Sequence, residues 1–390
     1  AETEGDITLY AKWNLAPLNI NGEGTEDMIW SWWYYPQVVS SGNNVFYGYS
    51  TSEGFCGVAK YDGKTGKTER TTLKCVLPAD DHNGLSVSEM DDGRIMCVYA
   101  GGHNNNNEIH IRISDEAGSI KSFTKHIVLE SAGKTCYGQV LRYKGEYYVF
   151  YRVNNHSWAY RCSSDGENWS EETILIKTTM QYYCRFMPTT KDGLFRICMY
   201  SNPREEDPNI RMGFFDAEKK VLLNSDTVTE LGTNRVSQEN FDVLIECSEG
   251  TRQRLFDVAI TEPLRPLILY TVFTSQNKAN DSVYYLYDSG NIQKICDGGV
   301  PIMSNNYQCG AAFAGRHQIA SIRNEDGKDI VELYDYSKGE ITLQREVYTK
   351  ETGENHHRNG RPIVDINGKA FIWHEGYYNP QKYTDFLTSA

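Results

Sequence analysis

A short motif recurs along this chain about every fifty residues, and it constrains the fold more than any other feature. In each copy a β-prone stretch ends in an aromatic or polar residue, which is followed by Asp and, in most copies, a Gly-containing turn. The aspartates are Asp62, Asp115, Asp165, Asp216, Asp288 and Asp335, at spacings of 53, 50, 51, 72 and 47 residues. A period of this length built from strands is typical of a β-propeller. The spacing of 72 predicts an insertion or an eroded turn in that blade.

The clearest copy of the motif is Ser163-Ser164-Asp165-Gly166-Glu167-Asn168-Trp169. It fits the Asp-box pattern SxDGxxW of sialidase-like propellers. In that pattern the Asp side chain ties the turn between outer strands and the Trp packs between blades. We therefore expect a structural role for this segment and no part in catalysis.

Apolar stretches of strand length accompany the turns, at 45–49, 95–99, 147–151, 195–200, 267–270 and 370–373. Aromatic residues make up 12% of the chain and there are 33 glycines, which favours strands and turns over helices. The sequence predicts an all-β protein in which residues 28–390 form a single β-propeller of four-stranded antiparallel blades. Seven blades fit the pattern best, while six or eight remain compatible with it.

The charge and hydropathy of the chain exclude two classes of partner. A net charge of −13 argues against nucleic acid, which requires a basic surface. No run of 18 apolar residues occurs, so we expect no insertion into a membrane. A polyanionic ligand would need basic residues gathered locally.

The ten cysteines are scattered and include no CxxC pair. Several lie inside apolar strands, such as Cys97 and Cys198, so buried free thiols are the favoured interpretation. Disulfides remain possible in an oxidising compartment. A structural metal ion is also possible, although no ligand spacing supports one.

Two histidines flank a predicted hairpin. His82 precedes a strand over 85–90, Asp92-Gly93 is a hairpin-turn signal, and a second strand covers 95–99. His103 follows that second strand. We therefore expect His82 and His103 to lie at the same end of the hairpin.

The segments Asp81-His82-Asn83, Asp92-Gly93-Arg94 and His103-Asn104 together resemble the BNR-4 repeat group of propellers. This group includes the ulvan lyases, which cleave uronate-containing polysaccharides by β-elimination. The likeness continues through 136–138 and 148–152, where Cys136 and Gly138-Gln139 replace the family's usual Thr and Asn-Pro. It ends in an Arg-Pro and Trp-Gly-Tyr blade at 359–377, and it covers roughly residues 28 to 390.

The resemblance implies roles for particular residues. His82 matches the family's catalytic histidine, His103 its second active-site histidine, Tyr137 its catalytic tyrosine, and Arg152 the arginine that faces the substrate carboxylate. No cofactor is required for such chemistry. The expected substrate contacts are Asn83, Asn104, Arg361 and Trp33.

Other residues compete for these roles. A shifted blade alignment would make Tyr183 with Arg185, or Arg196, the true pair. Stacking on sugars and packing between blades are equally favoured for the tryptophan-rich segment 30–35. The His356-His357-Arg358 segment contacts a ligand or a metal in one interpretation, and a solvated loop is the simpler one.

The first residues do not belong to the repeat. Residues 5–13 resemble the closing strand of the Listeria–Bacteroides surface repeat, so we expect residues 1–13 to be the tail of a preceding domain or a linker. That resemblance implies a secreted or cell-surface bacterial protein with other domains in a longer parent chain.

Three functions are compatible with the sequence. The first is a polysaccharide lyase acting on an acidic polysaccharide through His/Tyr acid–base chemistry, with Arg and His neutralising the uronate carboxylate. The second is a non-catalytic carbohydrate-binding or adhesin propeller. The third is a sialidase-like glycoside hydrolase, which would present several arginines to a carboxylate.

Overall fold

The computed structural model describes most of the chain from residue 34 onward. The described residues are 34–51, 54–75, 82–203, 205–274, 282–299, 310–315, 317–325, 328–351, 361–364, 370–375 and 384–389. Residues 1–13 and the tryptophans at 30, 32 and 33 lie outside this part, as does the segment His356-His357-Arg358. Within it the regular elements are strands and one short 3₁₀ helix.

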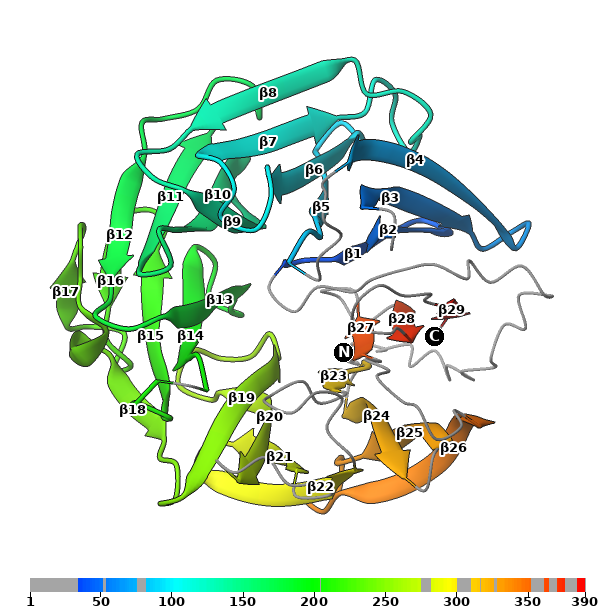
Figure 1. Cartoon of the computed structure of the whole chain (residues 1–390), viewed down its shortest axis with the longest axis vertical. Helices are drawn as coiled ribbons and strands as arrows, with labels where there is room; N and C mark the ends of the chain where they lie inside the picture. Colours follow the sequence, from blue (N-terminus) through cyan, green and yellow to red (C-terminus); the bar gives the residue numbers. More distant parts are fainter. Residues whose placement is uncertain are drawn as a thin grey trace, which may run out of the picture.

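The strands form antiparallel sheets arranged radially around a common axis (Figure 1). Blade 1 contains β1 (Val38–Ser41), β2 (Asn44–Ser50), β3 (Phe55–Asp62) and β4 (Lys67–Cys75). Blade 2 contains β5 (Ser86–Glu89), β6 (Ile95–Ala100), β7 (Glu108–Ile113) and β8 (Lys125–Glu130). Blade 3 contains β9 (Thr135–Tyr143), β10 (Glu146–Val153), β11 (Ser157–Ser163) and β12 (Thr173–Lys177). In each blade the first strand is innermost and the fourth is outermost (Figure 1).

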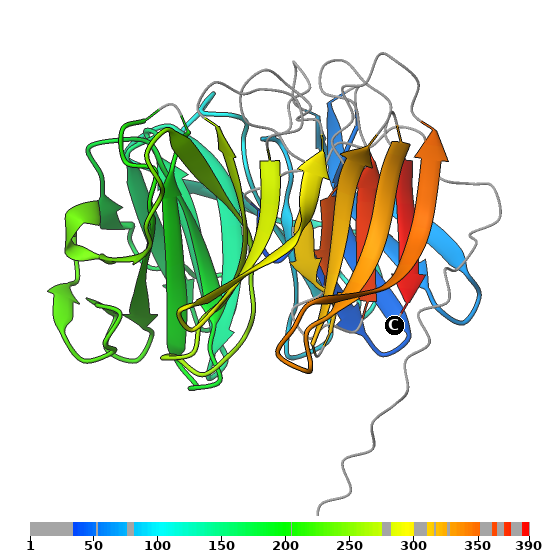
Figure 2. The ribbon, with the colours of Figure 1, turned by 90° about the horizontal axis from the view of Figure 1, so that it is seen from below.

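The next blades follow the same order. Blade 4 contains β13 (Tyr182–Pro188), β14 (Leu194–Ser201), β15 (Ile210–Asp216) and β16 (Val221–Leu223). Blade 5 contains β19 (Thr251–Val258), β20 (Leu267–Thr274), β21 (Ser282–Asp288) and β22 (Asn291–Gly299). Blade 6 contains β23 (Ala311–Phe313), β24 (Gln318–Glu325), β25 (Lys328–Asp335) and β26 (Thr342–Glu351). Seen edge-on, the strands run between the two faces of the ring (Figure 2).

The expected count of seven four-stranded blades is wrong, because the described residues form six. The six repeated aspartates each lie in the turn between the third and fourth strands of one blade. A further sheet has three described strands and lies between blades 6 and 1 (Figure 1): β27 (Arg361–Val364), β28 (Ala370–Glu375) and β29 (Thr384–Ser389). The apolar stretch at 370–373 therefore predicted a real strand, and it belongs to a sheet of three strands among the described residues.

The spacing of 72 residues is explained by an insertion in blade 4. After β16 the chain forms β17 (Glu230–Gly232), the 3₁₀ helix η1 (Gln238–Asn240) and β18 (Asp242–Ile245), which pairs back with β15. Within this excursion Val236 pairs in parallel with Ile176 of β12. The insertion thus covers part of the outer edge of blade 3, an edge that would otherwise offer unpaired backbone groups.

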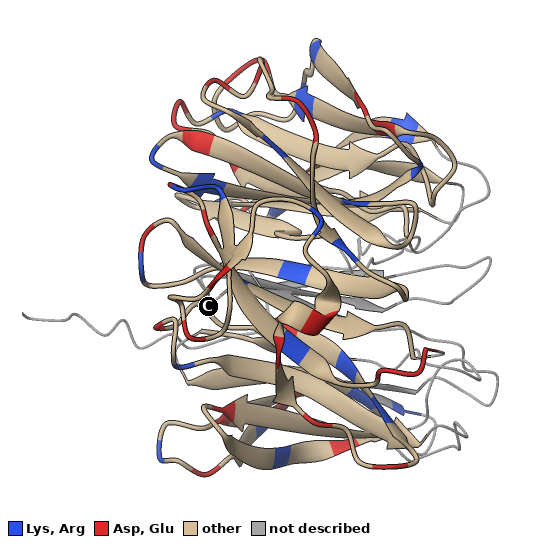
Figure 3. Cartoon of the chain, turned by 90° about the vertical axis from the view of Figure 1, so that its left-hand side faces the viewer, with Lys and Arg blue, Asp and Glu red and all other residues tan. Residues whose placement is uncertain are grey.

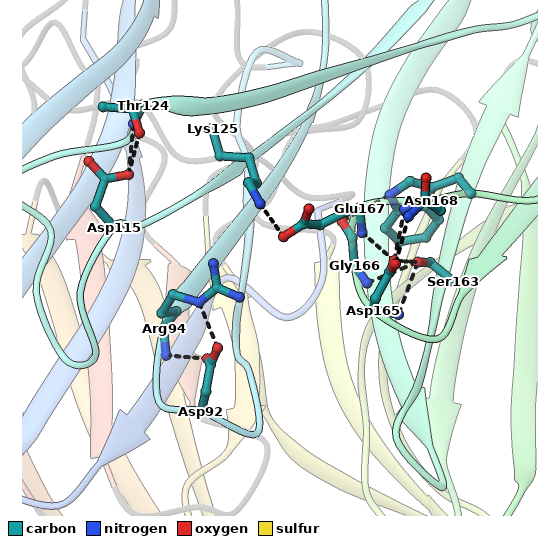
Figure 4. A network of polar contacts seen from close by, with 11 residues as sticks. Asp92, Arg94, Asp115, Thr124, Lys125, Ser163, Asp165, Gly166, Glu167 and Asn168 are labelled. Atoms are coloured by element: carbon teal, nitrogen blue, oxygen red, sulfur yellow. Dashed lines mark hydrogen bonds and ion pairs between the residues drawn. The ribbon is translucent and has the colours of Figure 1, made fainter.

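The Asp box of blade 3 is a structural link between blades. The Asp165 Oδ1 atom accepts hydrogen bonds of 2.8 Å from the backbone N–H groups of Glu167 and Asn168 (Figure 4). Trp169 packs against an apolar cluster that contains residues of blades 2 and 3. A Cβ atom at Gly166, where φ is +76°, would lie 2.8 Å from the Met96 side chain of blade 2. The expected structural role of this box is confirmed.

Candidate functional site

The hairpin of β5 and β6 brings the two histidines together. Its turn is held by Asp92, whose Oδ1 accepts a 3.0 Å hydrogen bond from the Arg94 N–H (Figure 4), and Gly93 adopts a φ of +79°. The rings of His82 and His103 stack with centroids 3.6 Å apart and planes 7° from parallel. His82 is buried, whereas His103 is partly exposed. The predicted pairing of these histidines is confirmed.

The loop that carries His103 is tied to the first strand of blade 3. The Asn104 N–H donates a 3.1 Å hydrogen bond to the Thr135 carbonyl, and the Thr135 N–H donates one of 2.8 Å to the Asn106 carbonyl. Thr135 is two residues from Tyr137. The backbone therefore fixes the histidine loop directly beside the strand that carries the tyrosine.

Tyr137 lies on a β-bulge. Phe150 pairs with Gln139 and Arg152 pairs with Cys136, so Tyr137 and Gly138 together face the single residue Tyr151. The φ of Tyr137 is +65°, in the left-handed region that a bulky side chain rarely occupies. Such a conformation costs on the order of 1–3 kcal/mol and is concentrated at functional sites. Bulges redirect side chains next to active sites, and here the Tyr137 ring lies 5.9 Å from that of His82.

The residues around Tyr137 hold this bulge in place. Gly138 lets β9 approach blade 2 closely, since a Cβ atom there would be 3.1 Å from the Val98 side chain. Gln139 links β9 to β13: its Nε2 donates to the Cys184 carbonyl at 2.6 Å and its Oε1 accepts from the Phe186 N–H at 3.0 Å. The Gly138-Gln139 departure from the family pattern therefore has a structural use in this chain.

Arg152 completes the group from the neighbouring strand β10. Its guanidinium carbon lies 4.5 Å from the centroid of the Tyr137 ring and 5.5 Å from that of Tyr183. Both contacts are within the range of cation–π attraction. The side chain is fully buried, and no described residue accepts a hydrogen bond in good geometry from its Nε, Nη1 or Nη2 atom.

The charge state of Arg152 follows from these neighbours. Burial by itself would lower the pKa of Arg152, but the adjacent Tyr137, Cys136 and Tyr183 groups outweigh it and hold that pKa above its ordinary value. The result is a buried cation. A buried charge without an acceptor is costly, and a carboxylate is the anion whose geometry matches a guanidinium.

The competing arginines are occupied elsewhere. Arg185 forms an ion pair with Asp257, with 3.2 Å between Nη1 and Oδ1. Arg196 is buried, and its guanidinium donates to the carbonyl groups of Ala259, Glu262 and Pro263. Of Arg152, Arg185 and Arg196, Arg152 is therefore the one suited to bind an external anion.

Tyr183 belongs to the same group as Tyr137, and the sequence offered the two as alternatives. Their ring centroids are 6.2 Å apart, and both rings contact the Arg152 guanidinium. The Tyr183 hydroxyl accepts a 3.1 Å hydrogen bond from Asn202 Nδ2. Asn202 was not expected from the sequence, because its proximity depends on how blade 4 packs beside blade 3.

The remaining expected contacts divide into three groups. Asn83 directly follows His82 and is buried, while the Asn104 side chain donates a 3.0 Å hydrogen bond to Asn155 Oδ1 on the rim. Arg361 begins β27, and only its place in that strand is described. Trp33 lies outside the described residues.

The structure bears on metals, thiols and surface charge as follows. The described part of the chain contains no group of three or more His, Cys, Asp or Glu residues that could hold a metal ion. Nine of the ten cysteines are described as free thiols, and those in apolar strands, including Cys97 and Cys198, are buried.

No helix among the described residues is long and apolar enough to cross a membrane. On the side shown in Figure 3, basic and acidic segments are interspersed.

The comparisons with known proteins identify the family. Residues 44–295 match the model of the BNR repeat-containing family, which is more than half of the chain, so the chain belongs to this family. A search of curated proteins found no significant match.

Solved structures with the same fold include polysaccharide lyases. An ulvan lyase of family PL25 superposes with a TM-score of 0.69 at 12% sequence identity, covering 94% of each chain. The same type of enzyme bound to -[GlcA(1-4)Rha3S]- gives a TM-score of 0.68 at 11% identity, again with 94% of each chain covered. The polysaccharide lyase Uly1 gives 0.59 at 14% identity, with 93% of this chain and 97% of that one covered. At these identities the likeness establishes the fold.

Proposed function

We propose that this protein is a polysaccharide lyase that cleaves a uronate-containing polysaccharide by β-elimination. The observation that carries the proposal is the buried Arg152 guanidinium, which has no hydrogen-bond acceptor in good geometry among the described residues and lies against the Tyr137 ring. His82 and His103 flank the blade 2 hairpin, and the His82 ring lies 5.9 Å from the Tyr137 ring. The site therefore combines one cation with three side chains that can move protons.

The chemistry of elimination explains why these groups are needed together. The C5 proton of a uronate is weakly acidic, because the adjacent carboxylate resists taking up further negative charge. Arg152 would neutralise that carboxylate and stabilise the charge that develops on it. A base must remove the C5 proton and an acid must protonate the departing O4. Histidine and tyrosine perform both kinds of transfer.

We assign the acid and base roles to His82 and Tyr137 as a pair, without dividing them. His103 stacks directly on His82, so it can orient that ring and share the neutralising role as a hydrogen-bond donor. The reaction requires no organic cofactor or metal. A solved lyase with this fold is bound to an oligosaccharide that contains glucuronate, which supports an acidic glycan as the ligand.

A binding-only propeller is the second candidate. It would use the same residues as the lyase: because Arg152 and Tyr137 have no exposed surface, both functions require the groups that cover them to move before a sugar can make contact. The hydrolase alternative is weaker, because Arg185 and Arg196 are already paired and do not form an arginine cluster with Arg152. The resemblance of residues 5–13 to a surface repeat supports action outside the cell, alongside other domains of a parent chain.

The test is incubation with a panel of uronate polysaccharides, followed by near-ultraviolet absorbance and by reducing-end release. Elimination raises both signals, hydrolysis raises only the second, and binding alone raises neither. We expect His82→Ala and Tyr137→Phe each to lower kcat by about 10²–10⁴-fold, the usual contribution of an acid or base. His126→Ala and Tyr287→Phe, which alter outer strands of blades 2 and 5, should retain the wild-type rate. Full activity in both site variants would rule out these roles.

A further inference from the structure

A second reactive group lies at the opposite end of the strands from the histidines. Cys162 is near the end of β11, Glu146 begins β10, and Lys220 is in the turn between β15 and β16 of blade 4. In the blade 3 ladder the pair Arg152–Trp158 is next to one end and the pair Tyr147–Ser163 is at the other. This group is therefore separate from the proposed uronate site and does not depend on it.

Lys220 reaches from blade 4 across to blade 3 and contacts both other members. Its Nζ atom lies 3.2 Å from the Cys162 Sγ atom and 3.2 Å from Glu146 Oε1. The Ser170 hydroxyl lies 3.6 Å from the same sulfur. Cys162 is 7% exposed, and the side chains of Lys220 and Glu146 are 41% and 30% exposed. A small oxidant in solvent can therefore reach the edge of this group.

The other thiols in apolar strands differ from Cys162 in their surroundings. Burial raises the pKa of Cys198 to about 12 and raises that of Cys97 further. Thiols in such settings are inert, whereas a neighbouring cation promotes attack by sulfur on an oxidant. Cys162 is the described cysteine with a lysine ammonium in direct contact with its sulfur.

We propose that Cys162 and Lys220 form a peroxide-driven sulfenamide cross-link. In the first step the Cys162 sulfur attacks one oxygen of hydrogen peroxide and the O–O bond breaks. The sulfur is oxidised by two electrons to a sulfenic acid, and the peroxide is reduced to water. In the second step Lys220 Nζ attacks that sulfur and the S–O bond breaks. Of the three ammonium protons, one leaves with the hydroxyl as water, one passes to solvent and one stays on the nitrogen.

The balance of the two steps is one thiol, one ammonium and one peroxide giving one sulfenamide, two waters and one proton. Burial by itself would lower the pKa of Lys220, but the contacts with Cys162 and Glu146 outweigh it and raise that pKa. Because the attacking amine must be neutral, the second step should become faster as the pH rises. The product joins blade 3 to blade 4 by a covalent bond that a thiol reductant reverses.

The test is treatment of the whole chain with hydrogen peroxide, followed by peptide mass spectrometry without reduction. We expect a linked pair of peptides containing Cys162 and Lys220, lighter than their sum by two hydrogen atoms. The yield should rise between pH 7 and pH 9, and dithiothreitol should restore both peptides. The cross-linked protein should also unfold at a higher denaturant concentration than the reduced protein, since the link constrains the unfolded chain.

Two controls separate the cross-link from general oxidation. Lys220→Arg keeps the positive charge but removes the amine, so Cys162 should proceed to higher oxides without a link. Cys75 is exposed and serves as an internal reference, because its thiol should be oxidised without forming a link to a lysine. Recovery of Cys162 as a free thiol, or as a sulfinic acid beside unlinked Lys220, would overturn the proposal.

Discussion

At the scale of single residues, the proposed site depends on groups held in unfavourable states. Tyr137 occupies a left-handed backbone conformation, and Arg152 is buried without a hydrogen-bond acceptor in good geometry among the described residues. Each state lowers the stability of the fold unless something compensates for it. Proteins retain such costs where function needs them. The coincidence of both at neighbouring positions is the strongest physical argument for a binding site here.

This leads to a prediction for Arg152→Met. The variant should lose uronate binding, yet it should unfold at the same temperature as the wild type or higher. An apolar side chain of similar size removes a buried cation that has no well-formed hydrogen bond, and replacing buried ions by apolar residues of similar volume is often neutral or stabilises a protein by about 1–4 kcal/mol. Thermal unfolding and binding to a uronate oligosaccharide would be measured together.

The matched control is Arg196→Met. Arg196 is also fully buried, but its guanidinium donates to several backbone carbonyl groups at 2.7–3.2 Å. Their loss leaves partly buried carbonyl acceptors without that donor and should destabilise the protein by about 1–3 kcal/mol. Equal destabilisation in the two variants would contradict the view that Arg152 lacks internal partners.

The surroundings of His110 predict that the free energy of unfolding falls as the pH is lowered. Its Nδ1 lies 3.0 Å from His126 Nε2 and its Nε2 lies 3.3 Å from Glu108 Oε2. Burial is the main cause that lowers the pKa of His110 to about 4, and the nearby His126, Lys74 and Arg112 act in the same direction while Glu108 opposes them. The unfolded chain takes up a proton near pH 6.5, whereas the folded chain does so only near pH 4. Stability from this group is therefore complete above about pH 6.5 and is lost as the pH falls towards 4.

Urea unfolding between pH 8 and pH 4 would measure this loss. His110→Gln keeps a polar side chain that does not titrate, so its curve should fall less steeply than that of the wild type over this interval. Identical slopes would show that His110 does not contribute to acid sensitivity.

At the scale of elements, the turn between the third and fourth strands is a stabilising motif that recurs from blade to blade. Asp62 and Asp216 accept backbone hydrogen bonds through Oδ1 in the same manner as Asp165. In blade 3 the Asp-box turn also packs on the adjacent blade through Trp169 and Gly166. One local motif therefore fixes both a hairpin and an interface.

Asp165→Ala should lower the free energy of unfolding by about 1–2 kcal/mol, because it removes an ionised acceptor from two backbone N–H groups. Asp288 occupies the equivalent turn of blade 5, where no described residue donates to its side chain. Asp288→Ala should therefore change stability by less than about 0.5 kcal/mol. Chemical denaturation of both variants would measure the difference, and equal effects would argue against the hydrogen bonds as the source.

At the scale of the whole molecule, closure of the ring depends on the last strands. The sheet of β27–β29 lies between blades 6 and 1 (Figure 1), and β27 follows β23 as the next inner strand. Without it, the facing surfaces of those two blades would be exposed. Exposed apolar faces and strand edges promote association.

A chain ending at residue 351 should therefore lose the cooperative unfolding of the full chain and form aggregates. Size-exclusion chromatography and thermal unfolding would test this. A monomeric truncated protein with the unfolding temperature of the full chain would show that six blades close the ring by themselves.

The sequence by itself determined the features that depend on local chemistry. Alternating strands, the Asp turns and the Asp92-Gly93 hairpin are encoded within a few residues, so the propeller class and the meeting of His82 with His103 followed directly. The count of blades did not, because a strand such as 370–373 reads the same in a sheet of three strands or of four.

Only the tertiary structure decided which side chains act together. Tyr137 turns towards His82 because of a register shift between β9 and β10, and such a shift leaves no mark in either strand alone. The choice of Arg152 over Arg185 and Arg196 depended on partners 63 to 72 residues away along the chain. Strands and turns arise from neighbouring residues, whereas the pairing of a buried charge is settled by how distant blades pack.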